Sequence, residues 1–252
     1  MSDAALLFAA VAFIFLFAGL VKGVIGVGLP TVAMGLLSVA MPPAEAAAIM
    51  VLPAVVTNLW QMAAGPALAV LARRFALMMA GVVVGTFATI GLLTGTSTSI
   101  ATGALGSVLA AYGFYGIAGA GFEVRRKSER YLSPLIGLIT GMLTGATGVF
   151  VIPVVPYLSS LKLEKEELIQ SIGISAFVCP AALWLALAVN GKYQAVVAGT
   201  SLVALLPALI GMYAGQHVRR RLQPAVFRRW FFCGLIALGG YMVFRSVRHA
   251  YA

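Results

Sequence analysis

The sequence predicts an all-α polytopic membrane protein made of two inverted repeats, each with a broken or re-entrant helical hairpin and three transmembrane helices. This prediction rests on the composition, on the placement of the basic residues and on an internal repeat of glycines. Of the 252 residues, 62% are hydrophobic and 10% are charged, against about 45–50% and about 25% in soluble domains. So little charge cannot cover a water-facing surface, which excludes the soluble and disordered classes.

Charged residues divide the chain into apolar stretches, and a membrane-spanning helix needs about 20 apolar residues. Two stretches on either side of Lys22, at 4–21 and 23–44, form the first hairpin. The stretch 75–122 is long enough for two spans, with a break at the polar run 94–99. The last stretch, Trp230–Phe244, is short for a span, but the arginines that flank it can extend to the membrane interface. The remaining single spans are predicted at Ala46–Ala72, Leu168–Gly191, Tyr193–Val218 and Trp230–Phe244.

The basic residues stand in short clusters between the apolar stretches, so the net charge of +10 indicates membrane topology and not a nucleic-acid partner. Lys192, Arg245 and Arg248 fall on the opposite side from these clusters. Thirteen of the 17 basic residues are predicted to face the cytoplasm: Arg73, Arg74, Arg125, Arg126, Lys127, Arg130, Lys162, Lys165, Arg219, Arg220, Arg221, Arg228 and Arg229.

This orientation constrains the stretch Tyr131–Leu161, because Arg130 and Lys162 lie on the same side of the membrane and the stretch must cross an even number of times. A symmetric hairpin leaves about 14 residues per arm, or about 21 Å, against a hydrocarbon core of about 30 Å. We therefore expect a re-entrant hairpin whose tip stops inside the membrane, buried in protein or lining a wet cavity.

Glycines recur at a fixed distance along the chain. Gly19, Gly23 and Gly26 return 122 residues later as Gly141, Gly145 and Gly148, and Glu45 returns as Glu167. Pro30 and Pro153 match with a slip of one residue, and the pair Gly81 and Gly85 returns 130 residues later as Gly211 and Gly215. Close helix packing explains any single glycine pair equally well, but it does not explain why the glycines, the proline and the acidic residue recur together.

Each half of the chain then holds one hairpin and three spans, so the halves are inserted upside down relative to each other, as in many transporters. The expected boundaries are a first repeat at 1–122, a cytoplasmic linker at 123–130 and a second repeat at 131–252.

The glycine-rich turn Gly19–Pro30, its second copy Gly141–Pro153 and the chain length resemble the sulfite exporter TauE/SafE family of membrane permeases. The resemblance implies a multi-pass protein of a bacterial inner membrane that transports small organosulfur or sulfur-oxyanion substrates such as sulfite or sulfoacetate. The second copy departs from the first, because Phe150 stands where the first turn has Gly28.

An anion inside a membrane needs hydrogen-bond donors and positive potential, and the N-termini of broken helices supply both. Glycine lets a ligand approach the backbone closely. The predicted substrate-binding elements are therefore the two turns and the hydroxyls near them: Gly23, Gly26, Gly28 and Thr31 in the first half, and Thr144, Gly145, Thr147 and Gly148 in the second.

Lys22 is the only charged residue between Asp3 and Glu45. It either attracts the anion during passage or marks the hairpin tip and extends to the cytoplasmic interface. The second copy has neutral Thr144 at the matching place.

Polar residues also occupy the span that follows each hairpin, where buried amides and hydroxyls need partners. They either line the substrate path or hold helices together. Pro53 and Pro180 are expected to kink these spans and to free a carbonyl group, and Glu45 and Glu167 to favour helix starts. The polar candidates are Asn58, Gln61, Gln170, Ser171 and Ser175.

No motif indicates a metal site, a cofactor or an intramembrane chain of carboxylates and histidines. A membrane enzyme would need such a group, and a non-transporting subunit would have no reason to break its helices. The leading prediction is an alternating-access anion permease, with transport of another small organic anion and a non-transporting membrane subunit as alternatives. The expected partners are a small anion and membrane lipid, and small-residue faces such as Gly81 and Gly85 would permit a homodimer.

Overall fold

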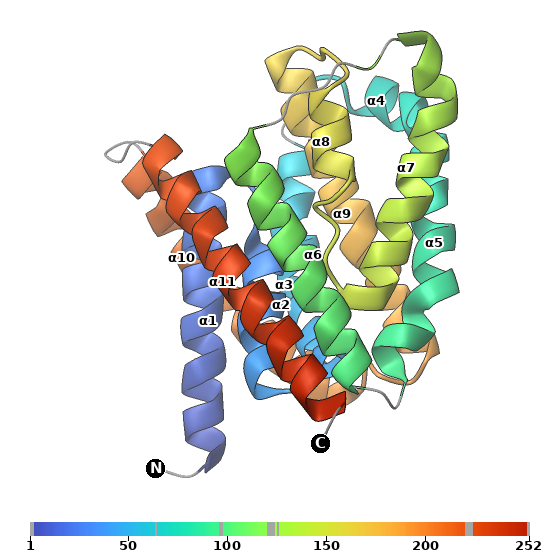
Figure 1. Ribbon diagram of the computed structural model, residues 1–252. Coiled ribbons are helices and arrows are strands. Elements are labelled where there is room, and N and C mark those ends of the chain that lie inside the picture. Colours follow the sequence, from blue (N-terminus) through green and yellow to red (C-terminus); the bar gives the residue numbers. More distant parts are fainter. Residues whose placement is uncertain are drawn as a thin grey trace.

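The computed structural model describes residues 3–63, 65–95, 98–119, 124, 126–219 and 224–250. Arg125, Arg220 and Arg221 of the basic clusters, and part of the expected linker 123–130, lie outside them. The described residues form helices and no strand (Figure 1). The helices are α1 (Asp3–Ile25), α2 (Leu29–Ala40), α3 (Pro43–Ala63), α4 (Leu68–Arg74), α5 (Ala76–Thr94), α6 (Thr98–Ala118), α7 (Arg126–Thr147), α8 (Val154–Ser159), α9 (Lys165–Val189), α10 (Ala195–Arg219) and α11 (Pro224–Ala250).

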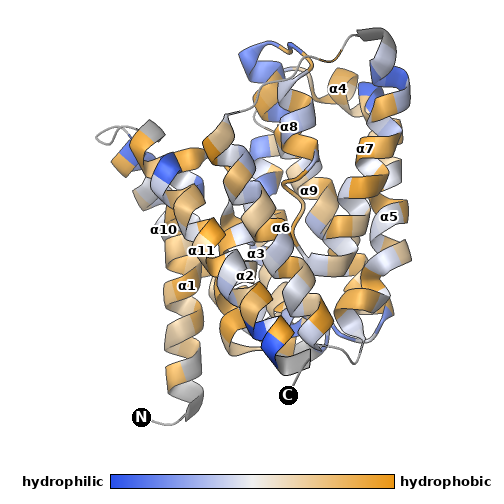
Figure 2. Ribbon diagram, in the orientation of Figure 1, coloured by the Kyte–Doolittle hydropathy of each residue, from blue (hydrophilic) through white to orange (hydrophobic). Residues whose placement is uncertain are grey.

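Seven helices within these ranges are long and apolar enough to cross a membrane, namely α1, α3, α5, α6, α9, α10 and α11. Large apolar side chains face outward along them, including Phe13, Leu77 and Leu206 at 66–68% exposure. Figure 2 shows hydrophobic residues distributed along the outward-facing helices and hydrophilic segments at the two ends. Soluble proteins seldom expose such large contiguous apolar surfaces, so the predicted all-helical polytopic membrane class is confirmed.

Both predicted helix breaks are present. The first lies at 26–28, where Gly26 and Gly28 have φ of 92° and 110°, values that favour glycine. Pro30 then occupies the first turn of α2, a position that needs no backbone N–H. The second lies at 148–153, where Gly148 has φ of 73°.

Neither hairpin is symmetric, and the expectation of two equal arms of about 14 residues for the stretch 131–161 is wrong. The first arms α1 and α7 contain 23 and 22 residues, and the second arms α2 and α8 contain 12 and 6. The reason is that the glycine positions set the breaks, while α7 begins in the charged segment at Arg126 and not at Tyr131.

Two further boundaries differ from the prediction. The apolar stretch 46–72 is not one helix, because Gly65 and Pro66 separate α3 from the short α4. The last helix, α11, has 27 residues, since it includes the arginines that flank the predicted short span.

Matched glycines pack the first arm of each hairpin against a helix of the other half. On α1, a Cβ atom at Gly19 would lie 2.1 Å from the carbonyl oxygen of Ala208 on α10. In return, a Cβ atom at Gly211 would lie 2.0 Å from the carbonyl oxygen of Leu16. Only glycine allows backbones to approach this closely.

The same relation holds between α7 and α5. A Cβ atom at Gly141 would lie 2.1 Å from the carbonyl oxygen of Val82, and one at Gly85 would lie 2.3 Å from that of Leu138. The face carrying Gly81 and Gly85 is therefore covered by α7 and is not the free surface expected to permit a homodimer.

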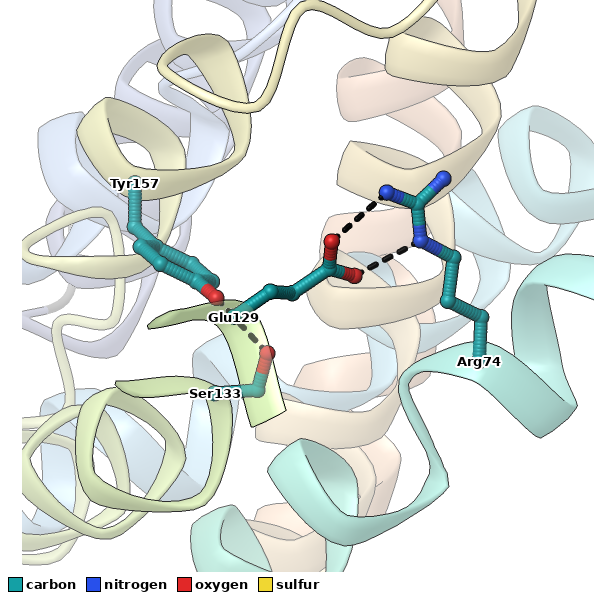
Figure 3. Close-up of polar contacts among 4 residues, drawn as sticks. All are labelled: Arg74, Glu129, Ser133 and Tyr157. Atoms are coloured by element: carbon teal, nitrogen blue, oxygen red, sulfur yellow. Dashed lines mark hydrogen bonds and ion pairs between the residues drawn. The ribbon is translucent and has the colours of Figure 1, made fainter. Parts of the chain in front are cut away.

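Arg74 and Glu129 join α4 to the start of α7 at the end of the molecule opposite the two chain termini (Figures 1 and 3). Arg74 donates from Nε and Nη2 to the two carboxylate oxygens of Glu129 at 2.7 and 2.8 Å. The hydrogen bonds that Arg74 donates to the Glu129 carboxylate raise the pKa of Arg74 above its ordinary value. One turn farther along α7, the hydroxyls of Ser133 and Tyr157 lie 2.7 Å apart and join α7 to α8.

Candidate functional site

Lys22 lies on α1, one turn before the first break, and only 5% of it is exposed. Its Nζ donates to Thr57 Oγ1 at 3.0 Å and to Asn58 Oδ1, both on α3. The expectation that Lys22 extends to the cytoplasmic interface is therefore wrong, because α3 holds its ammonium group inside the protein.

Among the described residues, the partners of the Lys22 ammonium group are neutral. The one ion pair found among the described residues joins Arg74 to Glu129, so no described carboxylate pairs with Lys22. An ammonium group carries three N–H donors, and the contacts to Thr57 and Asn58 use two. A buried unpaired cation is costly, and it is the kind of group that marks an ion pathway inside a membrane.

Pro180 explains the orientation of Asn58. Proline has no N–H, so Pro180 leaves the carbonyl of Ala176, four residues earlier on α9, without its usual helical partner. Asn58 Nδ2 donates to this carbonyl at 2.7 Å, which turns Asn58 Oδ1 toward Lys22. The carbonyl that Pro180 frees therefore orients the side chain of Asn58, which contacts the ammonium group of Lys22.

Pro53 acts in the same way on α3. It frees the carbonyl of Ile49, which accepts a hydrogen bond of 2.7 Å from Ser201 Oγ on α10. Thr57, four residues after Pro53, donates its hydroxyl to the carbonyl of Pro53 at 2.7 Å. The oxygen of Thr57 is thus oriented to accept from Lys22.

A small cavity of about 20 Å³ lies beside Lys22 and is bounded by both helix breaks. The first break contributes Val27 and Gly28 to its wall, and the second contributes Phe150 and Val151. The non-helical residues 149–151 are 0–4% exposed, which fits the rule that irregular backbone within a membrane is buried in protein or lines a cavity. The cavity wall consists of Lys22, Val27, Gly28, Pro30, Asn58, Phe150, Val151, Val154, Val155, Ile172, Ser175 and Ala176.

Some predicted site residues of the first half line the cavity, and the others lie outside its wall. Lys22, Gly28 and Asn58 line the cavity, and Gly26 sits in the break with open space where a side chain would be. Thr31 is fully buried, and its hydroxyl has no hydrogen-bond partner among the described residues.

Gly23 and Gln61 of the first half do not line the cavity. Gly23 is helical and faces α10, where a Cβ atom would lie 2.3 Å from the carbonyl oxygen of Met212. Gln61 is half-buried near the end of α3, where its backbone contacts Gly173.

The predicted residues of the second turn also lie outside the cavity wall. Thr144 and Thr147 donate their hydroxyls to carbonyls four residues earlier on α7, both at 2.7 Å. Gly145 faces the carbonyl of Thr86 on α5. Gly148 begins the break and contacts the side chain of Met34 on α2.

On α9, Ser175 lines the cavity, whereas Gln170 holds helices together. Gln170 Oε1 accepts from the backbone N–H of Ala67 at 2.9 Å, and its Nε2 donates to the carbonyls of Met62 and Gly65 at 3.0 and 2.8 Å. Ser171 is buried, and its hydroxyl is without a partner among the described residues.

The sequence interpretation missed Thr57 and the extended segment 149–151. A local signal exists for Thr57, which stands four residues after Pro53 and directly before Asn58. No such signal marks Phe150 or Val151, because their place beside Lys22 depends on how the two hairpins meet. Among the described residues, no three histidine, cysteine or acidic side chains lie together in a group that could hold a metal ion.

Comparison with known proteins identifies the family of the chain. The family model described as sulfite exporter TauE/SafE matches residues 11–242, which include both helix breaks, Lys22 and the helices that hold it. No curated protein and no solved structure matches the chain. The chain therefore belongs to the sulfite exporter TauE/SafE family, a family of membrane permeases for sulfur compounds, as its two glycine-rich turns predicted.

Proposed function

We propose that the protein exports a small sulfur oxyanion or sulfonate, such as sulfite or sulfoacetate, and that Lys22 binds the anion during passage. The observation that carries this proposal is a buried ammonium group with neutral partners, at the place where two helix breaks bound one cavity. An anion supplies the negative charge that the described surroundings of Lys22 lack.

The first break adds to the attraction. Gly28 precedes α2, a helix of 12 residues whose N-terminal end lies at the cavity. The first N–H groups of a helix have no internal partner, and the helix dipole places about half a positive charge there.

Transport by alternating access is part of the proposal. The cavity of about 20 Å³ has room for about one water molecule, so this conformation is closed and must widen to admit a sulfur oxyanion. The crossed packing of α1 on α10 and of α7 on α5 supports two inverted repeats, at 1–122 and 131–252, that move relative to each other around the site.

The proposed location is the inner membrane of a bacterium, with the clusters of arginine and lysine in the cytoplasm. Moving one negative charge out of an inside-negative cell gains about 2.3 kcal/mol per 100 mV. The membrane potential alone then suffices to drive export, and a proton relay is not required.

The test is efflux from proteoliposomes loaded with sulfite, thiosulfate, sulfoacetate or acetate. We expect efflux of one or more sulfur anions that rises when an inside-negative potential is imposed and does not respond to a pH gradient. Efflux that follows the pH gradient and ignores the potential would refute potential-driven export. Preference for acetate would refute the proposed substrate class and favour a general permease for small organic anions.

A further inference from the structure

A second and larger cavity is lined by residues of α2, α6 and α11, and Figure 1 shows that the start of α6 and the end of α11 lie at the end of the molecule where the two chain termini are marked. It measures about 350 Å³, and it is bounded by the end of α2, the start of α6 and the last turns of α11. No acidic side chain among the described residues lines it. Its wall consists of Ser38, Val39, Ala40, Met41, Thr98, Ser99, Thr102, Arg245 and Ser246.

Arg245 supplies a positive charge to this cavity. Its Nη1 donates to the carbonyl of Val39 at 2.8 Å, at the end of α2. This contact neutralises the negative end of that helix and fixes the position of the guanidinium. A guanidinium group carries five N–H donors, so most remain for a ligand. Its planar fork matches two oxygens of one oxyanion.

Ser38 is a second polar residue of the cavity wall. It is 4% exposed, it lines the cavity, and its hydroxyl has no hydrogen-bond partner among the described residues. Buried hydroxyls are normally hydrogen-bonded, because leaving one unpaired is costly. A rotation of this hydroxyl toward the cavity would let a bound oxyanion accept its hydrogen bond.

The start of α6 forms another, electropositive part of the cavity wall. Thr98 and Ser99 begin α6, whose first backbone N–H groups have no partner within the helix. Ser99 Oγ donates to the carbonyl of Ser246 at 3.0 Å, and Ser246 Oγ donates to that of Ser99 at 2.8 Å. These two bonds hold α6 against α11 beside the guanidinium.

We propose that this cavity is a second anion-binding site, which takes a small oxyanion through Arg245 and Ser38. It is joined to the first site by α2, since Gly28 and Pro30 at one end of that helix line the Lys22 cavity. A helix of 12 residues is about 18 Å long. The second site therefore receives the anion between Lys22 and the side of the membrane that carries the chain termini.

The inference uses the proposed function only to choose sulfite as the probe. Equilibrium binding of radiolabelled sulfite is measured on the purified full chain in detergent, with transport measured in parallel. We expect two sites in the wild type and one in Arg245→Gln. The matched control is Arg248→Gln, which removes an exposed arginine from the next turn of α11 and should keep both sites. Equal binding by wild type and Arg245→Gln would overturn the proposal.

Further variants separate binding from folding, because Arg245 also caps α2. Arg245→Lys keeps the charge but loses the fork, and it should weaken binding at this site about tenfold without lowering the unfolding temperature. Ser38→Asp places a negative charge in the wall and should abolish this site while leaving the Lys22 site intact. If both variants bind sulfite like the wild type, the site is refuted.

The two proposals fail in different ways. If the wild type does not transport sulfite but Arg245→Gln still removes one binding site, the proposed function fails and the second site stands. If transport depends on Lys22 and every Arg245 and Ser38 variant keeps both binding sites, the proposed function stands and the second site fails.

Discussion

Replacing Lys22 by methionine tests the central role of the buried cation. Methionine keeps an unbranched apolar side chain of similar length and removes the charge. If Lys22 binds the substrate, Lys22→Met should lose transport while the protein remains folded. If Lys22 only holds helices together, the same change should destabilise the protein, and transport should fall only as far as the folded fraction falls.

The expected size of the effect follows from the burial of Lys22. At 5% exposure the charge is poorly screened by salt. An anion about 4 Å from Nζ gains about 4 kcal/mol at an effective dielectric constant of about 20, which corresponds to about a thousandfold in binding. The substitution also leaves Asn58 Oδ1 without its donor, at a cost of about 1–3 kcal/mol, but it removes a buried cation whose desolvation costs several kcal/mol.

The assay combines sulfite efflux from proteoliposomes with thermal unfolding in detergent. We expect efflux to fall at least a hundredfold and the unfolding temperature to stay the same or to rise. Lys192→Met is the matched control, because Lys192 is exposed, and it should leave both quantities unchanged. Wild-type efflux in Lys22→Met would refute the reasoning, and so would loss of efflux accompanied by a large drop in unfolding temperature.

Three further predictions concern the residues around Lys22 and the contact between α5 and α7. Asn58→Asp places a carboxylate next to Lys22 and should abolish efflux in a folded protein, because the new ion pair replaces the substrate; wild-type efflux would contradict this. Pro180→Ala restores a helical N–H that competes with Asn58 for its carbonyl, and it should reduce efflux roughly threefold to tenfold, less than Asn58→Ala does. Gly141→Leu forces α7 away from α5 and should destabilise the protein by about 1–3 kcal/mol or more, measured by thermal unfolding. Gly199→Leu, at a position where a Cβ atom meets nothing within 4 Å, is its control.

The sequence is sufficient for the membrane class, for most helices and for the presence of both breaks. Membrane spans are predictable because each one needs a long local run of apolar residues, and such runs are read without knowledge of the neighbours. The lengths of the hairpin arms are harder to predict, because the composition of a stretch such as 131–161 does not indicate where within it a helix ends.

The glycines illustrate what the sequence leaves undecided. Glycine is needed both at positive φ angles and at close contacts between helices. The sequence shows a glycine at the same spacing in either case, so it does not distinguish the two roles. The recurrence at 122 residues therefore identifies the matching segments correctly, but it does not divide their roles. The structure assigns Gly26, Gly28 and Gly148 to the breaks, and it assigns Gly19, Gly23, Gly141 and Gly145 to helix contacts.

The candidate site also has features that the sequence determines and features that depend on the tertiary structure. The sequence by itself determined that Lys22 is a lone cation beside a glycine-rich turn, and that Pro180 frees a carbonyl group on its helix. Only the tertiary structure decided that Asn58 binds both, through contacts that join residues 36 and 118 positions apart. Helix periodicity and hydropathy describe neighbours within a few turns, whereas a hydrogen bond between helices depends on how three separate segments pack together.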